Sequence, residues 1–130
     1  MTFEELGIMP EIRNAIEELG FEHPMPIQEA VIPFLIKNEE LRMKNPSESS
    51  EPVPVNVPVP VNKDLIALAQ TGTGKTAAFG LPLLQMVDAK NRTTQAIVLS
   101  PTRELCLQIT DDLRDFSKYL KGINVVAEYG

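Results

Sequence analysis

The residues best suited to chemistry form one run, Ala69-Gln70-Thr71-Gly72-Thr73-Gly74-Lys75-Thr76. Glycines let a backbone wrap around a phosphate chain, so that several N–H groups can point inward. Lys75 would supply a cation for the outer phosphates, and the Thr76 hydroxyl would supply a ligand for Mg²⁺. Ala69 stands where the general pattern has glycine. An ordinary strand-to-helix turn with an incidental lysine is the alternative, but the whole octet favours nucleotide binding.

The elements around this loop are the ones that a phosphate site requires. Asp64–Ala69 is predicted as a buried strand, and a helix is predicted from Lys75 to Val87. The N-terminus of that helix would add a positive end to the site. Further along, Gln95–Ser100 and Ile123–Glu128 are predicted as short strands on either side of an amphipathic helix, Arg103–Tyr119. Strands that alternate with helices predict an α/β fold with a parallel sheet and flanking helices.

Two helices are predicted before the loop. The first begins at Pro10 and ends before Gly20, with an apolar stripe at three- and four-residue spacing. The second runs from Pro26 through Leu35, and Pro33 should bend it.

The stretch 37–62 has a different character. Its second half alternates proline with valine, and proline cannot donate to a strand ladder, so we predict an exposed or polyproline-like loop inserted there. The sequence therefore divides one partial domain, 1–130, into three parts: 1–36, the insertion 37–62, and 63–130.

Composition bounds the class of protein. Hydrophobic residues make up 43% of the 130 residues and charged residues 23%, as in a soluble globular domain. No apolar run approaches the roughly 18 residues of a membrane span, so we expect no membrane and a cytoplasmic location. The single cysteine, Cys106, excludes an internal disulfide. The net charge of −6 argues against a protein that coats nucleic acid, but not against a local phosphate grip.

Three ordered segments resemble motifs of the DEAD-box RNA helicases, a group of superfamily 2. The run Ala69–Thr76, with alanine first, resembles motif I; Gly20–Gln28 resembles the Q motif; and Pro101–Leu105 resembles motif Ia. Phe3 stands where the family has an isolated upstream aromatic residue. The resemblance implies the N-terminal part of a RecA-like domain, the first of two motor domains, with its C-terminal strands absent.

The resemblance also implies site residues. Gln28 would bond the adenine edge of ATP, and Phe3 would give the base an apolar surface; ATP and Mg²⁺ are the implied cofactors. Pro101, Thr102 and Arg103, together with Gly130, would contact the sugar-phosphate backbone of RNA without reading its sequence. Without the neighbouring motifs, Thr102 would be an ordinary helix cap and Arg103 a solvated side chain.

Met25 departs from the family pattern, which has threonine or serine there, and the long insertion is a second departure. A hydroxyl at position 25 could cap the helix that begins at Pro26, so its loss should weaken the positioning of Gln28 by about 1 kcal/mol.

The resemblance further implies what these 130 residues lack. The family's Asp-Glu-Ala-Asp segment and second motor domain do not occur in them. We therefore expect the ATP-binding part of an ATP-dependent RNA helicase that locally unwinds RNA duplexes, inactive by itself and prone to self-association through an unpaired strand. A P-loop ATPase of another helicase group, such as a DNA helicase, and a non-catalytic nucleotide- or RNA-binding module remain as alternatives.

Overall fold

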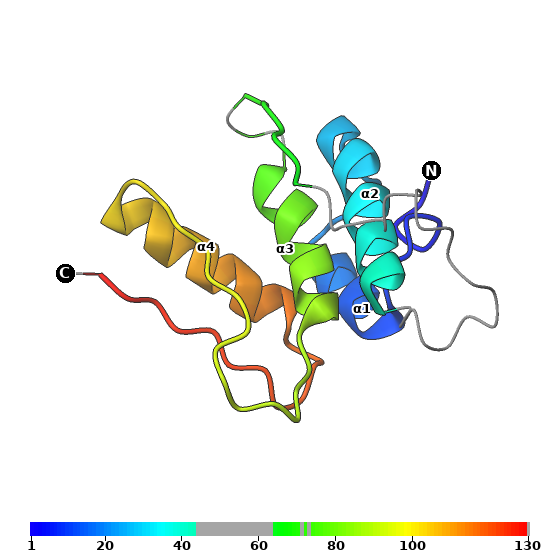
Figure 1. Cartoon of the computed structure of the whole chain (residues 1–130). Coiled ribbons are helices and arrows are strands. Elements are labelled where there is room, and N and C mark those ends of the chain that lie inside the picture. The colour runs from blue at the N-terminus through cyan, green and yellow to red at the C-terminus, as the bar shows by residue number, and fades with distance from the viewer. Residues whose placement is uncertain (44–63, 71, 73, 130) are drawn as a thin grey trace, which may run out of the picture.

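The helices of the chain surround a single small core. The computed structural model describes residues 1–43, 64–70, 72 and 74–129. Its helices are α1 (Pro10–Glu18), α2 (Pro26–Met43), α3 (Lys75–Met86) and α4 (Arg103–Phe116). Helix α3 packs against both α2 and α4, and α1 packs against α4 (Figure 1). The predicted phosphate loop thus lies at the start of a helix that is held by neighbours on both sides.

All four predicted helices are confirmed, with small differences at their ends. Helix α3 ends one residue before Val87, and α4 ends at Phe116 rather than Tyr119. Helix α2 continues past Pro33 to Met43, and so enters the stretch 37–62 that the sequence assigned to an inserted loop. The proline-valine part of that stretch lies outside the described residues.

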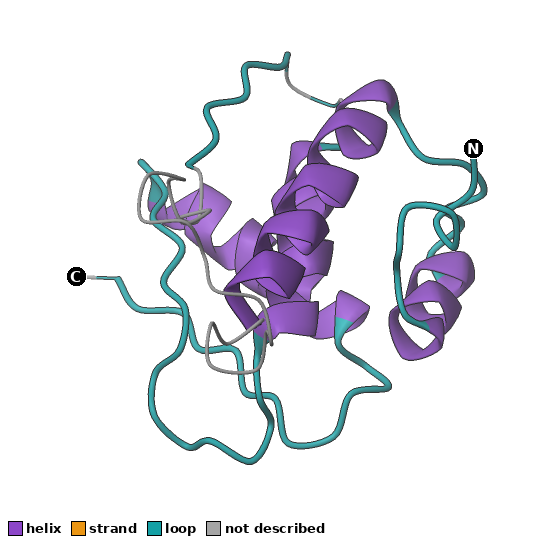
Figure 2. Ribbon diagram, turned by 45° about the vertical axis from the view of Figure 1, so that its right-hand side comes forward, coloured by secondary structure: helices purple, strands orange, loops and turns teal. Residues whose placement is uncertain are grey.

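The three predicted strands are not found in the part of the chain that the structure describes. Figure 2 shows loops at all three segments, Asp64–Ala69, Gln95–Ser100 and Ile123–Glu128. Within the described residues, no backbone hydrogen bond joins one of these segments to another. A strand exists only where a neighbouring backbone accepts and donates its hydrogen bonds. The hydrophobic pattern of a segment predicts that its side chains will be buried, but it does not show which segment will pair with its backbone. For this reason the sequence alone suggested strands here.

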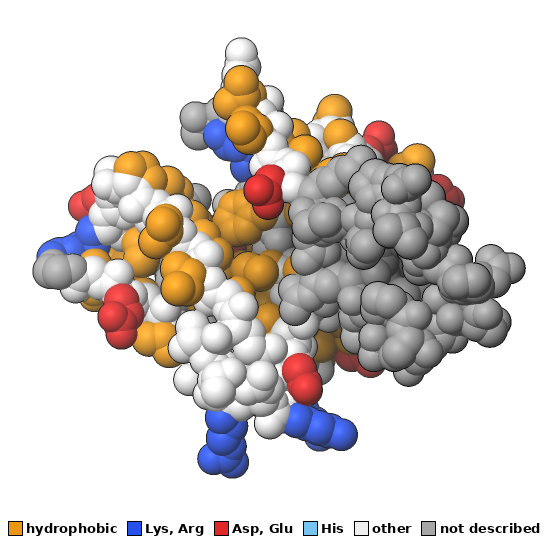
Figure 3. Space-filling view, in the orientation of Figure 1, with side chains coloured by type: hydrophobic (Ala, Val, Ile, Leu, Met, Phe, Trp, Pro, Cys, Tyr) orange, Lys and Arg blue, Asp and Glu red, His pale blue; other side chains and the backbone are white. Residues whose placement is uncertain are grey.

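These segments leave large apolar side chains uncovered. Ile66 is 89% exposed, Leu68 92% and Leu99 90%. In Figure 3 hydrophobic atoms lie exposed on the projecting loop that precedes α3. The prediction that Asp64–Ala69 is a buried strand is therefore wrong for the chain as described.

The core is formed by the apolar faces of the helices and by the N-terminal turn. Its members are all buried: Phe3, Leu6, Ile8, Ile12, Ile16, Ile32, Ala77, Leu81, Leu84, Ile109, Leu113 and Phe116. Burying a side chain of this kind stabilises a fold by about 1.5–3 kcal/mol. Phe21 lies partly buried between two of them, 6.3 Å from the Phe3 ring and 5.9 Å from the Phe116 ring. The core therefore joins the region before the loop to the helices after it.

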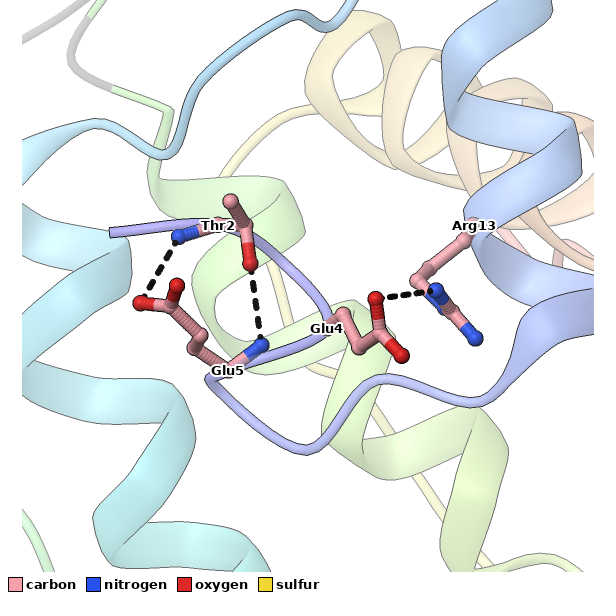
Figure 4. A network of polar contacts seen from close by, with 4 residues as sticks. All are labelled: Thr2, Glu4, Glu5 and Arg13. Carbon is pink, nitrogen blue, oxygen red and sulfur yellow. Dashed lines mark hydrogen bonds and ion pairs between the residues drawn. The ribbon is translucent and has the colours of Figure 1, made fainter.

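The N-terminal turn that carries Phe3 is held by local polar contacts. The Glu5 N–H donates to the Thr2 hydroxyl at 3.1 Å, and the Thr2 N–H donates back to the Glu5 carboxylate at 3.4 Å (Figure 4). Arg13 on α1 pairs with Glu4 at 3.2 Å. The Gln85 side chain on α3 accepts from the Met9 N–H at 2.7 Å. These contacts fix the turn against both α1 and α3.

No helix within the described ranges is long and apolar enough to cross a membrane.

Candidate nucleotide and nucleic-acid sites

The N-terminal end of α3 has the local geometry of a phosphate site. Gly72 and Gly74 both adopt left-handed backbone conformations, with φ of 81° and 84°. Gly74 precedes the first residue of α3, and no side chain within the described part of the chain caps that helix. The first N–H groups of a helix have no partner inside it, and they carry the positive end of the helix dipole. An anion placed here would meet several free donors.

Lys75 and Thr76 begin this helix, at the same end. Lys75 is exposed, and its ammonium group donates to the Ala69 carbonyl at 2.8 Å, which spans the loop from end to start. The Thr76 side chain is half-buried one residue later. Gln70 is exposed beside Ala69, while Thr71 and Thr73 lie outside the described residues. A phosphate oxygen would compete with the Ala69 carbonyl for the same ammonium group.

The donor set fits a nucleotide phosphate chain with its metal. Backbone N–H groups, one ammonium and the helix end all favour an anion. Mg²⁺ usually takes only one or two protein ligands and completes its shell with water and phosphate oxygens. The single Thr76 hydroxyl at the start of α3 is therefore enough to fit a metal that accompanies a nucleotide.

Gln28 lies against the phosphate loop. The residue is only 2% exposed, and its Nε2 donates to the Gly74 carbonyl at 3.2 Å. A Cβ atom on Gly74 would stand 2.4 Å from that nitrogen, so only glycine permits the approach. Two residues that the sequence assigned separately to nucleotide binding are thus in direct contact, although 46 positions separate them.

Gln28 also caps its own helix. Its Oε1 accepts from the Met25 N–H at 2.8 Å, which is the contact that a glutamine at the third helical position makes with the residue before the helix. Pro26 marks the first helical position in the sequence, so this contact could have been predicted but was missed. The bond holds the Gln28 carboxamide in place even though Met25 has no hydroxyl.

Phe3 lies in the core rather than at an open surface. It is 6% exposed and packs against Phe21. The sequence assigned Phe3 a role beside the adenine base, and that role remains a prediction. For Phe3 to contact the adenine base, an edge of its ring would have to become accessible. Phe21, in contrast, is partly buried and packs between the Phe3 and Phe116 rings.

The start of α4 gathers the residues predicted to grip an RNA backbone. Thr102 caps the helix by accepting from the Leu105 N–H at 3.2 Å. Pro101, Thr102 and Arg103 are all exposed, and the Arg103 guanidinium lies 4.8 Å from the centre of the Tyr129 ring. Gly130, the fourth predicted residue, lies outside the described part. A hydroxyl, a guanidinium and helix N–H groups therefore meet at one exposed point.

A polar cluster missed by the sequence reading ties α1 to the end of α4. Lys118 Nζ lies 2.7 Å from the Glu18 carboxylate, and the Tyr119 hydroxyl donates to the same carboxylate. The hydrogen bond from Lys118, followed by that from Tyr119, lowers the pKa of Glu18. Within α4, partial burial raises the pKa of Asp112, with a smaller contribution from Asp115 and then Asp111. Both features belong to the packing of α4.

The two left-handed glycines and the helix that begins at Lys75 have the local geometry of the P-loop class of proteins. Residues 53–130 match the DEAD/DEAH box helicase family, and the chain belongs to that family. The relative "ATP-dependent RNA helicase DeaD" of Escherichia coli K12 is 41% identical over 99% of this chain. "DEAD-box ATP-dependent RNA helicase CshA" of Geobacillus kaustophilus is 40% identical over 99% of it. The chain spans only 17% of the first relative and 22% of the second.

Solved structures of such helicases share the backbone arrangement. S. cerevisiae Dbp5 bound to RNA and ADP BeF3 superposes with a TM-score of 0.71 and 34% identity, covering 92% of this chain and 25% of that one. The RNA-helicase Prp28 from Chaetomium thermophilum bound to ADP gives a TM-score of 0.72 and 34% identity, covering 99% of this chain and 26% of that one. The fold is therefore that of part of a DEAD-box helicase.

Proposed function

We propose that this chain is the ATP-binding part of an ATP-dependent RNA helicase, formed by the front of its first RecA-like domain. The observation that carries the proposal is the hydrogen bond between Gln28 and Gly74, because it joins the side chain predicted to bind adenine to the loop predicted to bind phosphate. The relatives named as ATP-dependent RNA helicases support the same assignment. In the complete enzyme, the segments that are unpaired here would become strands of a parallel sheet.

Phosphate binding follows from the loop. The N–H groups at the start of α3 and the left-handed glycines would surround the phosphate chain, and Lys75 would exchange the Ala69 carbonyl for a phosphate oxygen. The Thr76 hydroxyl would hold Mg²⁺, which when bound neutralises charge on the outer phosphates. These residues bind and orient the nucleotide.

Adenine selection would depend on the hydrogen-bonding groups of Gln28 that are not used by Met25 and Gly74. A carboxamide has two acceptor sites and two N–H donors, and one of each is already used by Met25 and Gly74. The remaining acceptor and donor match the adenine edge, which presents a donor beside an acceptor. Guanine presents two acceptors, O6 and N7, where adenine presents the N6–H donor and the N7 acceptor, so the remaining acceptor of Gln28 would be left unpaired.

RNA would be held at the start of α4. The Thr102 hydroxyl and the Arg103 guanidinium are exposed beside the helix N-terminus, a combination suited to phosphate oxygens. Contacts of this kind place a strand without reading its bases. The chain would thus grip the RNA backbone at one site and ATP at another, as a part of a cytoplasmic enzyme that separates short duplexes.

The experiment is a thermal-melting series on the chain with MgATP and with MgGTP. At a ligand concentration 100-fold above Kd, binding stabilises a protein by about 2.7 kcal/mol. We expect MgATP to raise the melting temperature more than MgGTP does, and Lys75→Ala to abolish the shift. Lys90→Ala, which changes an exposed lysine outside the loop, is the matched control. An equal shift in the Lys75→Ala variant would overturn the proposal.

Turnover separates binding from catalysis. We expect the 130-residue chain to bind ATP without steady hydrolysis, because the groups that stabilise the transition state belong to other parts of the enzyme. Steady phosphate release that disappears in Lys75→Ala would contradict the expectation that this chain binds ATP without hydrolysing it.

A further inference from the structure

The C-terminal segment of the described chain is fastened along α4. Arg114 donates from Nε and Nη2 to the Val125 carbonyl, at 3.1 and 2.9 Å. Farther along, the Cys106 thiol lies 4.0 Å from the Glu128 carbonyl. Figure 1 shows this segment, in red, running beside α4 toward the end at which α4 begins. These contacts bring Tyr129 back to the predicted RNA grip.

At that end the Tyr129 ring meets the Arg103 side chain. The guanidinium carbon lies 4.8 Å from the ring centre, within the range of a cation–π contact. Tyr129 is 53% exposed and Arg103 is exposed, so the pair stands at the surface beside the capped start of α4. A planar guanidinium can stack on an aromatic face, and the stacking limits the orientations that its fork of N–H groups can take.

We propose that Tyr129 is a positioning residue for RNA binding, whose ring holds the Arg103 guanidinium beside the Thr102 hydroxyl. The inference rests on the proposed RNA-binding role of Arg103. An arginine side chain has several rotatable bonds, and ordering it on a phosphate costs conformational entropy. A ring that already restrains it lowers this cost without touching the RNA.

Three features favour this role over direct stacking of Tyr129 on a base. One face of the Tyr129 ring already lies next to the Arg103 guanidinium. The segment is tied to α4 at Val125 and Glu128, so the ring is delivered to Arg103 by the fold itself. The neighbouring Thr102 and helix end are groups that select phosphate rather than bases.

The test is a double-mutant cycle with a fluorescent single-stranded oligouridylate as the probe. Arg103→Ala should weaken binding and reduce the slope of log K against log salt by about 0.7, the loss of one phosphate contact. Tyr129→Leu should weaken binding about two- to fivefold, the size of an exposed cation–π contact. In the Arg103→Ala background Tyr129→Leu should have no further effect. With Arg103 intact, Tyr129→Phe keeps the ring and should retain wild-type affinity.

Tyr119→Leu is the matched control, because Tyr119 is also an exposed tyrosine with a cation over its ring, Lys118 at 5.4 Å. It should leave RNA affinity unchanged, and circular dichroism should show the fold intact in every variant. If Arg103→Ala does not weaken binding, the proposed RNA site itself is wrong. If Arg103→Ala weakens binding but Tyr129→Leu is neutral, tightens binding, or adds fully to Arg103→Ala, the positioning role of Tyr129 is overturned while the RNA site stands.

Discussion

The carboxamide of Gln28 makes two hydrogen bonds, one to its own helix and one to the phosphate loop. The first caps α2 at Met25, and the second fixes the Gly74 carbonyl. The sequence resemblance assigns Gln28 to adenine, yet the structure adds a task that needs no nucleotide. If Gln28 binds adenine as proposed, a movement of its amide would disturb the hydrogen bond to Gly74, the residue just before Lys75.

Replacement of Gln28 tests this second task at the scale of the residue. We expect Gln28→Ala to lower the free energy of unfolding by about 1–3 kcal/mol without any nucleotide, since the partly buried Met25 N–H and Gly74 carbonyl each lose a hydrogen bond. Urea unfolding measures the loss. Gln108→Ala, which changes an exposed glutamine on α4, is the control and should alter stability by no more than about 0.5 kcal/mol. If Gln28→Ala and Gln108→Ala are equally stable, Gln28 has no structural role, and only its proposed role in base recognition remains.

The helices are the elements that sequence reasoning located well. Their apolar spacing and their start signals are local, so Pro10, Pro26 and Lys75 are each found at the predicted first position. The strands are different, because their hydrogen bonds must come from segments far along the chain. Helix α2 also shows a limit, since it passes Pro33 and runs on to Met43 against the local signal.

At the scale of the element, α4 depends on its cap. Thr102→Ala should destabilise the chain by about 1 kcal/mol, because the Leu105 N–H loses its acceptor. Thr102→Ser keeps the hydroxyl and should recover most of the loss in the same urea titration. Thr94→Ala, in the exposed loop before Gln95, serves as the neutral control. If Thr102→Ser loses as much stability as Thr102→Ala, the loss would come from the methyl group of threonine and not from the capping hydroxyl.

Across the whole molecule, a buried helical core coexists with exposed apolar segments. Phe3, Ile12 and Leu81 are enclosed, whereas Ile66 and Leu68 lie almost fully in solvent. Extended backbone without a neighbouring strand is a template for pairing with another chain. The chain spans only 17% of the length of the first relative.

We therefore predict that the chain self-associates as its concentration rises. Sedimentation velocity should show larger species in the wild type that dissociate on dilution. Changing Ile66 and Leu68 together to lysine should suppress them, because charge on an exposed strand edge opposes pairing. Leu107→Lys, on the exposed surface of α4, is the control. A monomer at every concentration, with a sharp melt that does not depend on concentration, would contradict the prediction.

By itself, the sequence determined the four helices and the family and predicted the phosphate loop, because glycine conformations, capping and apolar spacing are encoded within a few neighbouring residues. Only the tertiary structure decided that Gln28 bonds Gly74, that Phe3 is enclosed, and that Arg103 lies over Tyr129. It also decided that the apolar segments at Ile66 and Leu99 remain unpaired in the described part. Each of these depends on which distant residues meet, and that outcome follows from packing rather than from local pattern.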